Sequence, residues 1–133
     1  MEEKRTHSGN QCNLFCTKCG VLLTSAIKGV GRGATCKACE NSRKRKERKY
    51  RQLNIQLKLI ERLGGKCTTC NKEATKENMV CFDFHHIHKE DKESAISNML
   101  AESKPYKIIE KEADKCILLC ACCHRLHHHI NGY

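Results

Sequence analysis

Eight cysteines of this chain stand in four Cys-x-x-Cys pairs, and these pairs are the feature of the sequence that most directly indicates chemistry. The pairs are Cys16/Cys19, Cys36/Cys39, Cys67/Cys70 and Cys120/Cys123. A Cys-x-x-Cys turn places two thiolates on one side of a tight loop, which is half of a tetrahedral zinc site. Because two pairs must meet to complete each site, the sequence predicts two structural zinc ions.

The spacing between the pairs predicts how they combine. The first two pairs are separated by the 16 residues 20–35, which is the usual spacing of a four-cysteine zinc ribbon. The last two pairs are separated by the 49 residues 71–119, too many for a single finger loop. We therefore expect the second cluster to hold a larger module closed at its base.

Four histidines indicate metal chemistry beyond structural zinc. His85 and His86 are adjacent, and His124 and His128 stand four residues apart near the end of the chain. Two histidines at positions i and i+4 of a helix share a face and can bind one ion. A third ligand from the other pair would leave coordination positions open, as a catalytic metal requires. Adjacent His85 and His86 must diverge, so one can face the metal while the other stays free as a base.

These histidines and their neighbours resemble a known family. Phe84-His85-His86-Ile87, together with the run from Lys115 to Arg125, resembles the HNH endonucleases, most closely their small zinc-stapled forms in phages and mobile elements such as homing endonucleases. The resemblance covers about residues 64–130 and implies a ββα-metal fold, in which a hairpin and a helix surround one divalent ion.

The resemblance also implies roles for particular residues. His85, His124 and His128 would hold the catalytic ion, His86 would be the general base, and Asp83 would orient its neighbours. The ion could be Mn, Mg, Ni, Co or Zn, and imidazole ligands favour the transition metals among them. The asparagine that names the family would fall at Lys115 or at Cys122, and neither position is asparagine here.

Charge is distributed unevenly along the chain. The sequence carries 25 Lys and Arg against 15 Asp and Glu, a net charge of +10, and the whole excess lies in residues 1–66. The densest run comprises Arg43, Lys44, Arg45, Lys46, Arg48, Lys49 and Arg51. Like charges at i and i+4 destabilise an isolated helix, so this run predicts binding to DNA phosphates. The alternative is a solvated basic face that serves solubility.

The sequence also indicates the helices and strands that must position these residues. Residues 41–63 have apolar side chains at helical spacing, and the two glycines that follow predict the end of the helix. Residues 79–84 and 116–119 have the composition of strands. Residues 94–112 are expected to be helical with a break near Pro105, and residues 121–130 to form a last helix.

Together these elements predict an α+β protein built from small zinc-stabilised modules. A zinc ribbon is expected at residues 1–41, a basic and amphipathic linking helix at 42–63, and an HNH nuclease module at 64–133. Only 5% of the 133 residues are aromatic, so the apolar core must be thin. Modules this small usually need metal or disulfides to stay folded.

The remaining candidates have simpler interpretations. Cys12 could replace a ribbon ligand, although a free thiol is the simpler interpretation. Cys81 and Cys116 are expected on the paired strands as small core residues. His127 and His129 are expected to face solvent or DNA.

The first ten residues are polar and no apolar run is long enough to span a membrane, so neither a secretory signal nor a membrane segment is expected. We therefore expect a cytoplasmic protein of a bacterial host or phage-infected cell, where reduced thiols favour zinc over disulfides. DNA is the expected partner. The sequence does not fix the oligomeric state, and a monomer is one of the possibilities.

The sequence favours a metal-dependent DNA endonuclease that hydrolyses a phosphodiester bond. Two other classes of function stay open. One is a catalytically inert, zinc-dependent regulator that binds DNA or RNA, and the other is a zinc-ribbon scaffold that binds protein partners.

Overall fold

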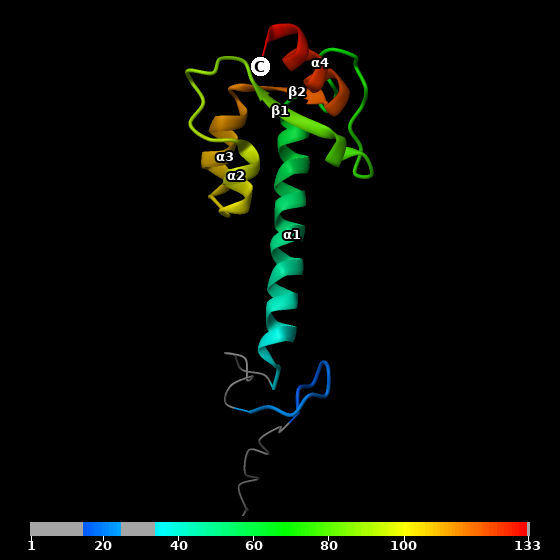
Figure 1. Cartoon of the computed structure of the whole chain (residues 1–133), viewed down its shortest axis with the longest axis vertical. Helices are drawn as coiled ribbons and strands as arrows, with labels where there is room; N and C mark the ends of the chain where they lie inside the picture. Colours follow the sequence, from blue (N-terminus) through cyan, green and yellow to red (C-terminus); the bar gives the residue numbers. More distant parts are fainter. Residues whose placement is uncertain (1–14, 25–33, 133) are drawn as a thin grey trace, which may run out of the picture. The chain divides into compact units, whose positions relative to one another are not determined.

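The computed structural model describes residues 15–24 and 34–132, and the chain divides into two compact units, Met1–Glu47 and Arg48–Tyr133. The elements run in the order α1 (Lys37–Arg62), the 3-10 turn η1 (Met79–Cys81), β1 (Phe82–His86), α2 (Ile96–Ala101), α3 (Tyr106–Ala113), β2 (Cys116–Cys120) and α4 (Ala121–Asn131) (Figure 1). This mixture of helices with one small sheet confirms the predicted α+β class.

The described part of the first unit is a short turn around four cysteines, followed by the start of α1. Phe15 and Leu22 form an isolated antiparallel bridge, and the backbone N–H of Cys16 donates to the carbonyl of Val21 at 2.8 Å. Helix α1 begins directly after Cys36, four residues earlier than the sequence predicted, so the second cysteine pair lies at the start of the helix. The remaining part of the predicted ribbon, residues 25–33, lies outside the described residues, as does Cys12.

In the second unit, β1 and β2 form an antiparallel hairpin whose register runs from Phe82 opposite Cys120 to His86 opposite Cys116. Side chains alternate between the two faces of a strand. Asp83 and His85 therefore share one face of β1, and Phe84 and His86 share the other. The hairpin contacts α4 through both of its strands.

The second half of α1 lies in the core of this unit. Ile60 packs against Phe82 and Leu118 of the hairpin, whereas Leu59 packs against Ile96 of α2 and Ile109 of α3. Figure 1 shows α2 and α3 beside this part of α1. Each fully buried Leu or Ile contributes about 1.5–3 kcal/mol. The C-terminal half of α1 is thus part of the second unit, and the boundary between the units falls within the helix.

The ends of the elements follow from local sequence. Gly64 and Gly65, which follow the end of α1 after Leu63, adopt positive φ angles of 93° and 67°, which confirms the predicted glycine stop. The predicted helix over 94–112 is broken as expected, into α2 and α3. The predicted strand over 79–84 begins three residues later, at Phe82, because residues 79–81 form the 3-10 turn. Cys81 is accordingly exposed, whereas Cys116 is buried on β2 as predicted.

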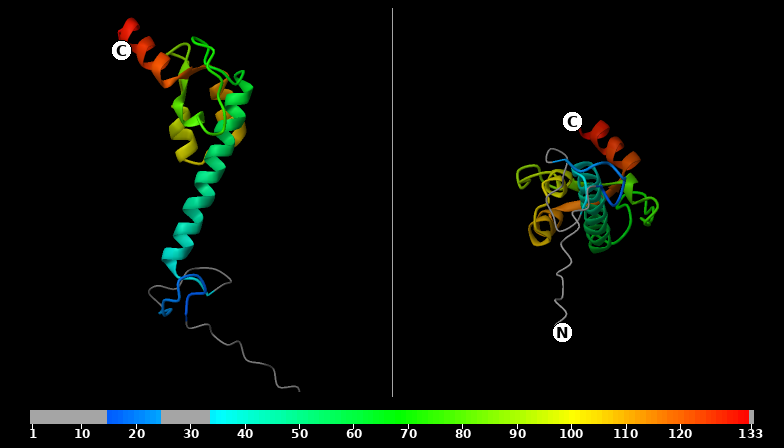
Figure 2. Two further views of the ribbon diagram at one scale, coloured as in Figure 1. Left: turned by 90° about the vertical axis from the view of Figure 1, so that its right-hand side faces the viewer. Right: turned by 90° about the horizontal axis from the view of Figure 1, so that it is seen from below.

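Helix α4 follows β2 without a loop. The sulfur of Cys120 accepts a hydrogen bond from the backbone N–H of Cys123 and so caps the first turn. The left view of Figure 2 shows α4 extending away from the hairpin toward the C terminus. Among the described residues, no helix combines the length and the apolar character that crossing a membrane requires.

Candidate functional site

The first cysteine cluster unites the first two pairs. The sulfur atoms of Cys16, Cys19, Cys36 and Cys39 all lie within 4.8 Å of one another. The sulfurs of Cys19 and Cys36 are 3.6 Å apart. Four sulfurs around a tetrahedral zinc ion at Zn–S distances of about 2.3 Å would be separated by about 3.8 Å. The cluster therefore has the composition and the size of a zinc site.

The second cluster has the same form and closes the module as predicted. Cys67, Cys70, Cys120 and Cys123 have sulfurs within 4.8 Å of one another, and those of Cys70 and Cys120 are 3.7 Å apart. This cluster joins the loop after α1 to the end of the hairpin and the start of α4. A zinc ion here would fix the base of the hairpin relative to the helix.

Hydrogen bonds shift the pKa values of thiols in both clusters. The N–H of Cys36 donates to the sulfur of Cys16 and, as the largest cause, lowers the pKa of the Cys16 thiol to about 6. By contrast, hydrogen bonds with neighbouring cysteine side chains, above all those of Cys19 and Cys120 respectively, raise the pKa values of Cys39 and Cys123 to about 12. The two clusters thus gather thiols that a bound zinc ion would stabilise as thiolates.

A third group consists of three histidines at one end of the hairpin. Ring nitrogens of His85 from β1 and of His124 and His128 from α4 lie within 4.8 Å of one another. The Nε2 atoms of His124 and His128 are 2.9 Å apart, which follows from their i and i+4 positions on the helix. The structure thus brings together the three residues predicted to hold a catalytic metal.

Asp83 fixes the orientation of one of these rings. Its Oδ2 lies 3.0 Å from Nδ1 of His124. A carboxylate accepts but does not donate a hydrogen bond, so Nδ1 of a neutral His124 is the donor and Nε2 is left with a lone pair for a metal. Metal-binding histidines are commonly oriented by a carboxylate in this way.

Burial keeps His85 in the form that binds metals. The residue is 8% exposed. Burial, followed by repulsion from His127, His124, His128 and His86, lowers the pKa of His85 to about 4. Burial also lowers the pKa of His128, with smaller effects from His124, His127 and Lys89. Neutral imidazoles offer a lone pair to a cation, so the three-histidine group suits a transition metal with nitrogen ligands.

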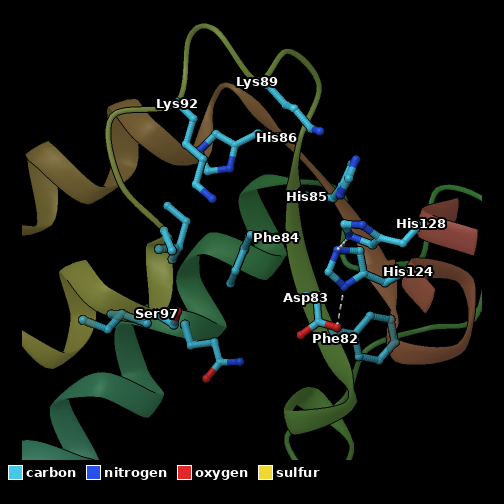
Figure 3. Close-up of a pocket in the computed structure, with 14 residues that line it drawn as sticks. Phe82, Asp83, Phe84, His85, His86, Lys89, Lys92, Ser97, His124 and His128 are labelled. Atoms are coloured by element: carbon cyan, nitrogen blue, oxygen red, sulfur yellow. Dashed lines mark hydrogen bonds and ion pairs between the residues drawn. The ribbon is translucent and has the colours of Figure 1, made fainter. Parts of the chain in front are cut away.

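His86 diverges from His85, as predicted, but one of its two ring nitrogens is engaged by another residue. Its Nε2 lies 2.7 Å from Oε1 of Glu112, and the His86 side chain is 8% exposed. Figure 3 shows His85 directed toward His124 and His128, whereas His86 points to the opposite side of β1, near Lys92. The sequence analysis did not identify Glu112, the residue that binds His86.

One pocket connects these groups. Its volume is about 670 Å³, and its lining includes Asp83, His85, His86, His124 and His128 (Figure 3). Two cations from the loop after β1, Lys89 and Lys92, also line it. The pocket thus combines a possible metal centre, a second imidazole and positive charge, which suits a substrate that carries phosphate.

The prediction that His127 faces solvent or DNA is wrong, because the residue is half-buried beside His85. Its ring lies 4.4 Å from that of His85, between centroids, and its Nδ1 is buried without a hydrogen-bond partner among the described residues. His129 is exposed on the same helix, as predicted. The i and i+3 spacing of His124 and His127 could have indicated that both lie near one face of α4.

The basic run lies on α1 with its residues exposed, from Arg43 to Arg51. Two of its cations are neutralised locally, because Arg43 forms ion pairs with Glu40 and Glu47, and Lys44 lies 3.8 Å from Glu40. Within the described ranges, Arg45, Lys46, Arg48, Lys49 and Arg51 form no ion pair. Those five are the cations most available to an anionic partner.

No protein family matches the chain, and neither a curated protein nor a solved structure matches it.

Proposed function

We propose that this protein is a metal-dependent DNA endonuclease of the HNH type, which hydrolyses a phosphodiester bond in the pocket of Figure 3. The observation that carries the proposal is that ring nitrogens of His85, His124 and His128 lie within 4.8 Å of one another in a pocket that His86 also lines. The resemblance of the sequence to HNH endonucleases supports the same assignment of residues.

The three-histidine group is suited to a catalytic ion because it provides three ligands. Structural zinc sites use four protein ligands, whereas three leave room for water or substrate. A divalent ion bound there would act as a Lewis acid on a phosphate oxygen and on the departing 3′ oxygen. Asp83 orients His124, and the two four-cysteine clusters would hold structural zinc at other points of the fold.

His86 would act as the general base in this reaction. It lines the same pocket but is not one of the three converging ligands, so its ring can accept a proton from the attacking water. Lys89 and Lys92 would attract the phosphate into the pocket. Attack by water with departure of the 3′ oxygen leaves 5′-phosphate and 3′-hydroxyl ends.

The exposed cations of α1 would bind the DNA backbone. Contacts to phosphates provide affinity and orientation without reading sequence. One three-histidine group makes one active site, so a single chain would cut one strand of the duplex. We expect a nick as the first product.

A second candidate function is a DNA- or RNA-binding regulator without catalytic activity. The observation that favours it is the small exposure of the His86 side chain, which is engaged by Glu112. The two candidates differ in whether water bound at the pocket can reach His86.

Cleavage of a supercoiled plasmid separates the two candidates. The zinc-loaded protein with added Mn²⁺ or Co²⁺ should convert the plasmid to relaxed circles, and EDTA should stop the conversion. The His86→Ala variant should lose cleavage by about 10²–10⁴-fold while it still binds DNA. His88→Ala, which alters an exposed histidine beside the motif, is the matched control and should cut as the wild type does. Equal cleavage by wild type and His86→Ala would contradict the role of His86.

A further inference from the structure

Glu112 is a buried acidic residue, and both oxygens of its carboxylate have hydrogen-bond partners. It lies on α3 and is 1% exposed. Its Oε1 lies 2.7 Å from His86 Nε2 and accepts hydrogen bonds from the backbone N–H groups of Glu93 at 2.9 Å and Ser94 at 3.3 Å. Its Oε2 accepts one from Lys115 Nζ at 2.8 Å. A buried carboxylate without such partners would be strongly destabilising.

These partners keep the carboxyl group ionised. Burial alone would raise the pKa of Glu112, but hydrogen bonds from Lys115, His86 and the two backbone N–H groups outweigh burial and hold the pKa at about 2. An ionised carboxylate can only accept hydrogen bonds. Two backbone N–H groups and the Lys115 ammonium already donate to this carboxyl group, so it acts as an acceptor and Nε2 of His86 donates to it. In the neutral ring the lone pair then lies on Nδ1.

Lys115 connects this pair to the loop that follows β1. Its Nζ donates to Oε2 of Glu112, to Oε1 of Glu93 at 2.9 Å and to the backbone carbonyl of Asp91 at 3.0 Å. The loop carries Lys89 and Lys92, which line the pocket. Lys115 stands directly before β2, at one of the two positions where the HNH pattern has asparagine.

We propose that Glu112 is a positioning residue that holds His86 in the tautomer whose Nδ1 accepts a proton, and that Lys115 fixes Glu112 and the loop after β1 in place. The inference rests on the proposed endonuclease function, since His86 has a proton to accept only in that reaction. Glu112 touches no reacting atom and acts through His86.

The tautomer can be measured directly by NMR. Long-range ¹H–¹⁵N correlation spectra of the zinc-loaded, ¹⁵N-labelled protein should show His86 protonated at Nε2 and not at Nδ1. In Glu112→Gln the amide offers both a donor and an acceptor, so both tautomers should be populated. Protonation of His86 at Nδ1 alone in the wild type would overturn the assignment.

A double-mutant cycle on single-turnover nicking tests whether Glu112 acts through His86. Glu112→Gln should slow nicking by about 10–100-fold, the effect typical of residues that orient a functional histidine, with DNA affinity and zinc content unchanged. In the His86→Ala background the same substitution should have no further effect on the residual rate. Glu110→Gln, which removes a charge from the same helix, is the matched control and should leave the rate unchanged.

The outcomes separate this inference from the function on which it rests. If the wild type cuts no DNA with any of the ions tested, the proposed function is wrong, and the tautomer still decides the inference about Glu112. Two results would show that the role of Glu112 is wrong while the proposed function stands. In one, the wild type cuts and Glu112→Gln cuts equally fast. In the other, Glu112→Gln lowers the rate by the same factor in the His86→Ala background as in the wild-type background.

Discussion

Oδ2 of Asp83 lies 3.0 Å from Nδ1 of His124, so a carboxylate of β1 orients an imidazole of α4. The contact joins the two elements that supply the candidate metal ligands. It also leaves Nε2 of His124 facing Nε2 of His128 at 2.9 Å. The hairpin and the helix thus bring the three candidate ligands together.

Replacement of this carboxylate should weaken metal binding. Asp83→Asn keeps the shape of the side chain but removes its charge, so we expect the affinity of the zinc-loaded protein for Co²⁺ or Mn²⁺ to fall about 10–100-fold. Calorimetric titration measures the affinity. Glu90→Gln, which neutralises an exposed acidic residue in the loop after β1, is the control. An unchanged affinity in Asp83→Asn would show that the contact does not support a metal site.

The second four-cysteine cluster should be required for folding of the C-terminal unit. Native mass spectrometry should find two zinc ions that resist brief EDTA treatment and one divalent ion that exchanges. Cys67→Ser should lose one of the two zinc ions and lower the melting temperature strongly, because binding of structural zinc supplies folding free energy. Cys122→Ser alters an exposed cysteine of α4 outside the cluster and should retain both ions. Full zinc content in Cys67→Ser would contradict the site.

The unpaired cations of α1 should determine how DNA binding depends on salt. Lys46→Ala with Lys49→Ala should reduce the slope of log K against log salt by about 1.8, because each phosphate contact contributes about 0.9. Lys72→Ala with Lys76→Ala removes the same charge from an exposed loop in the C-terminal unit and should leave the slope nearly unchanged. Equal slopes for all three proteins would show that the DNA contacts lie outside α1.

Glu112 should make stability depend on pH in the acidic range. Its pKa is about 2 in the folded protein against an ordinary value of 4.5, so the unfolded chain binds the proton more readily. Its contribution is complete above about pH 5 and is lost as the pH falls toward 2. The difference in unfolding free energy between wild type and Glu112→Gln should therefore shrink by up to roughly 3 kcal/mol over this range.

Guanidinium unfolding at a series of pH values measures this difference. Both proteins are compared at pH values at which each still binds zinc, so protonation of the zinc-binding thiols affects the two equally. A difference that does not shrink below about pH 5 within this range would contradict the ionised, buried state of Glu112.

The sequence predicted the parts of the candidate site that depend on short spacing. Cys-x-x-Cys turns and the i, i+4 pair of His124 and His128 are fixed by local geometry, so their grouping could be inferred before the fold was known. The glycines after α1 and the break near Pro105 were predicted correctly for the same reason.

The residues that the sequence did not reveal depend on distant contacts. Glu112 binds His86 across 26 positions, and no short motif joins them. One signal was present, because Glu112 shares the helical spacing of Ile109 and Ala113, which are buried on α3, and a charged residue on an apolar face must find partners. The predicted start of β1 was three residues too early, because Met79, Val80 and Cys81 have strand composition but form a 3-10 turn.

Metal-dependent nicking by variants of α4 tests the central claim most directly. Supercoiled plasmid should be converted to relaxed circles by the zinc-loaded wild type with Mn²⁺ or Co²⁺, and equally by His129→Ala, which alters an exposed histidine on the same helix. His124→Ala should bind DNA and keep both zinc ions but produce no relaxed circles. Nicking by His124→Ala at the wild-type rate, or persistence of nicking in EDTA, would contradict a catalytic ion held by the three histidines.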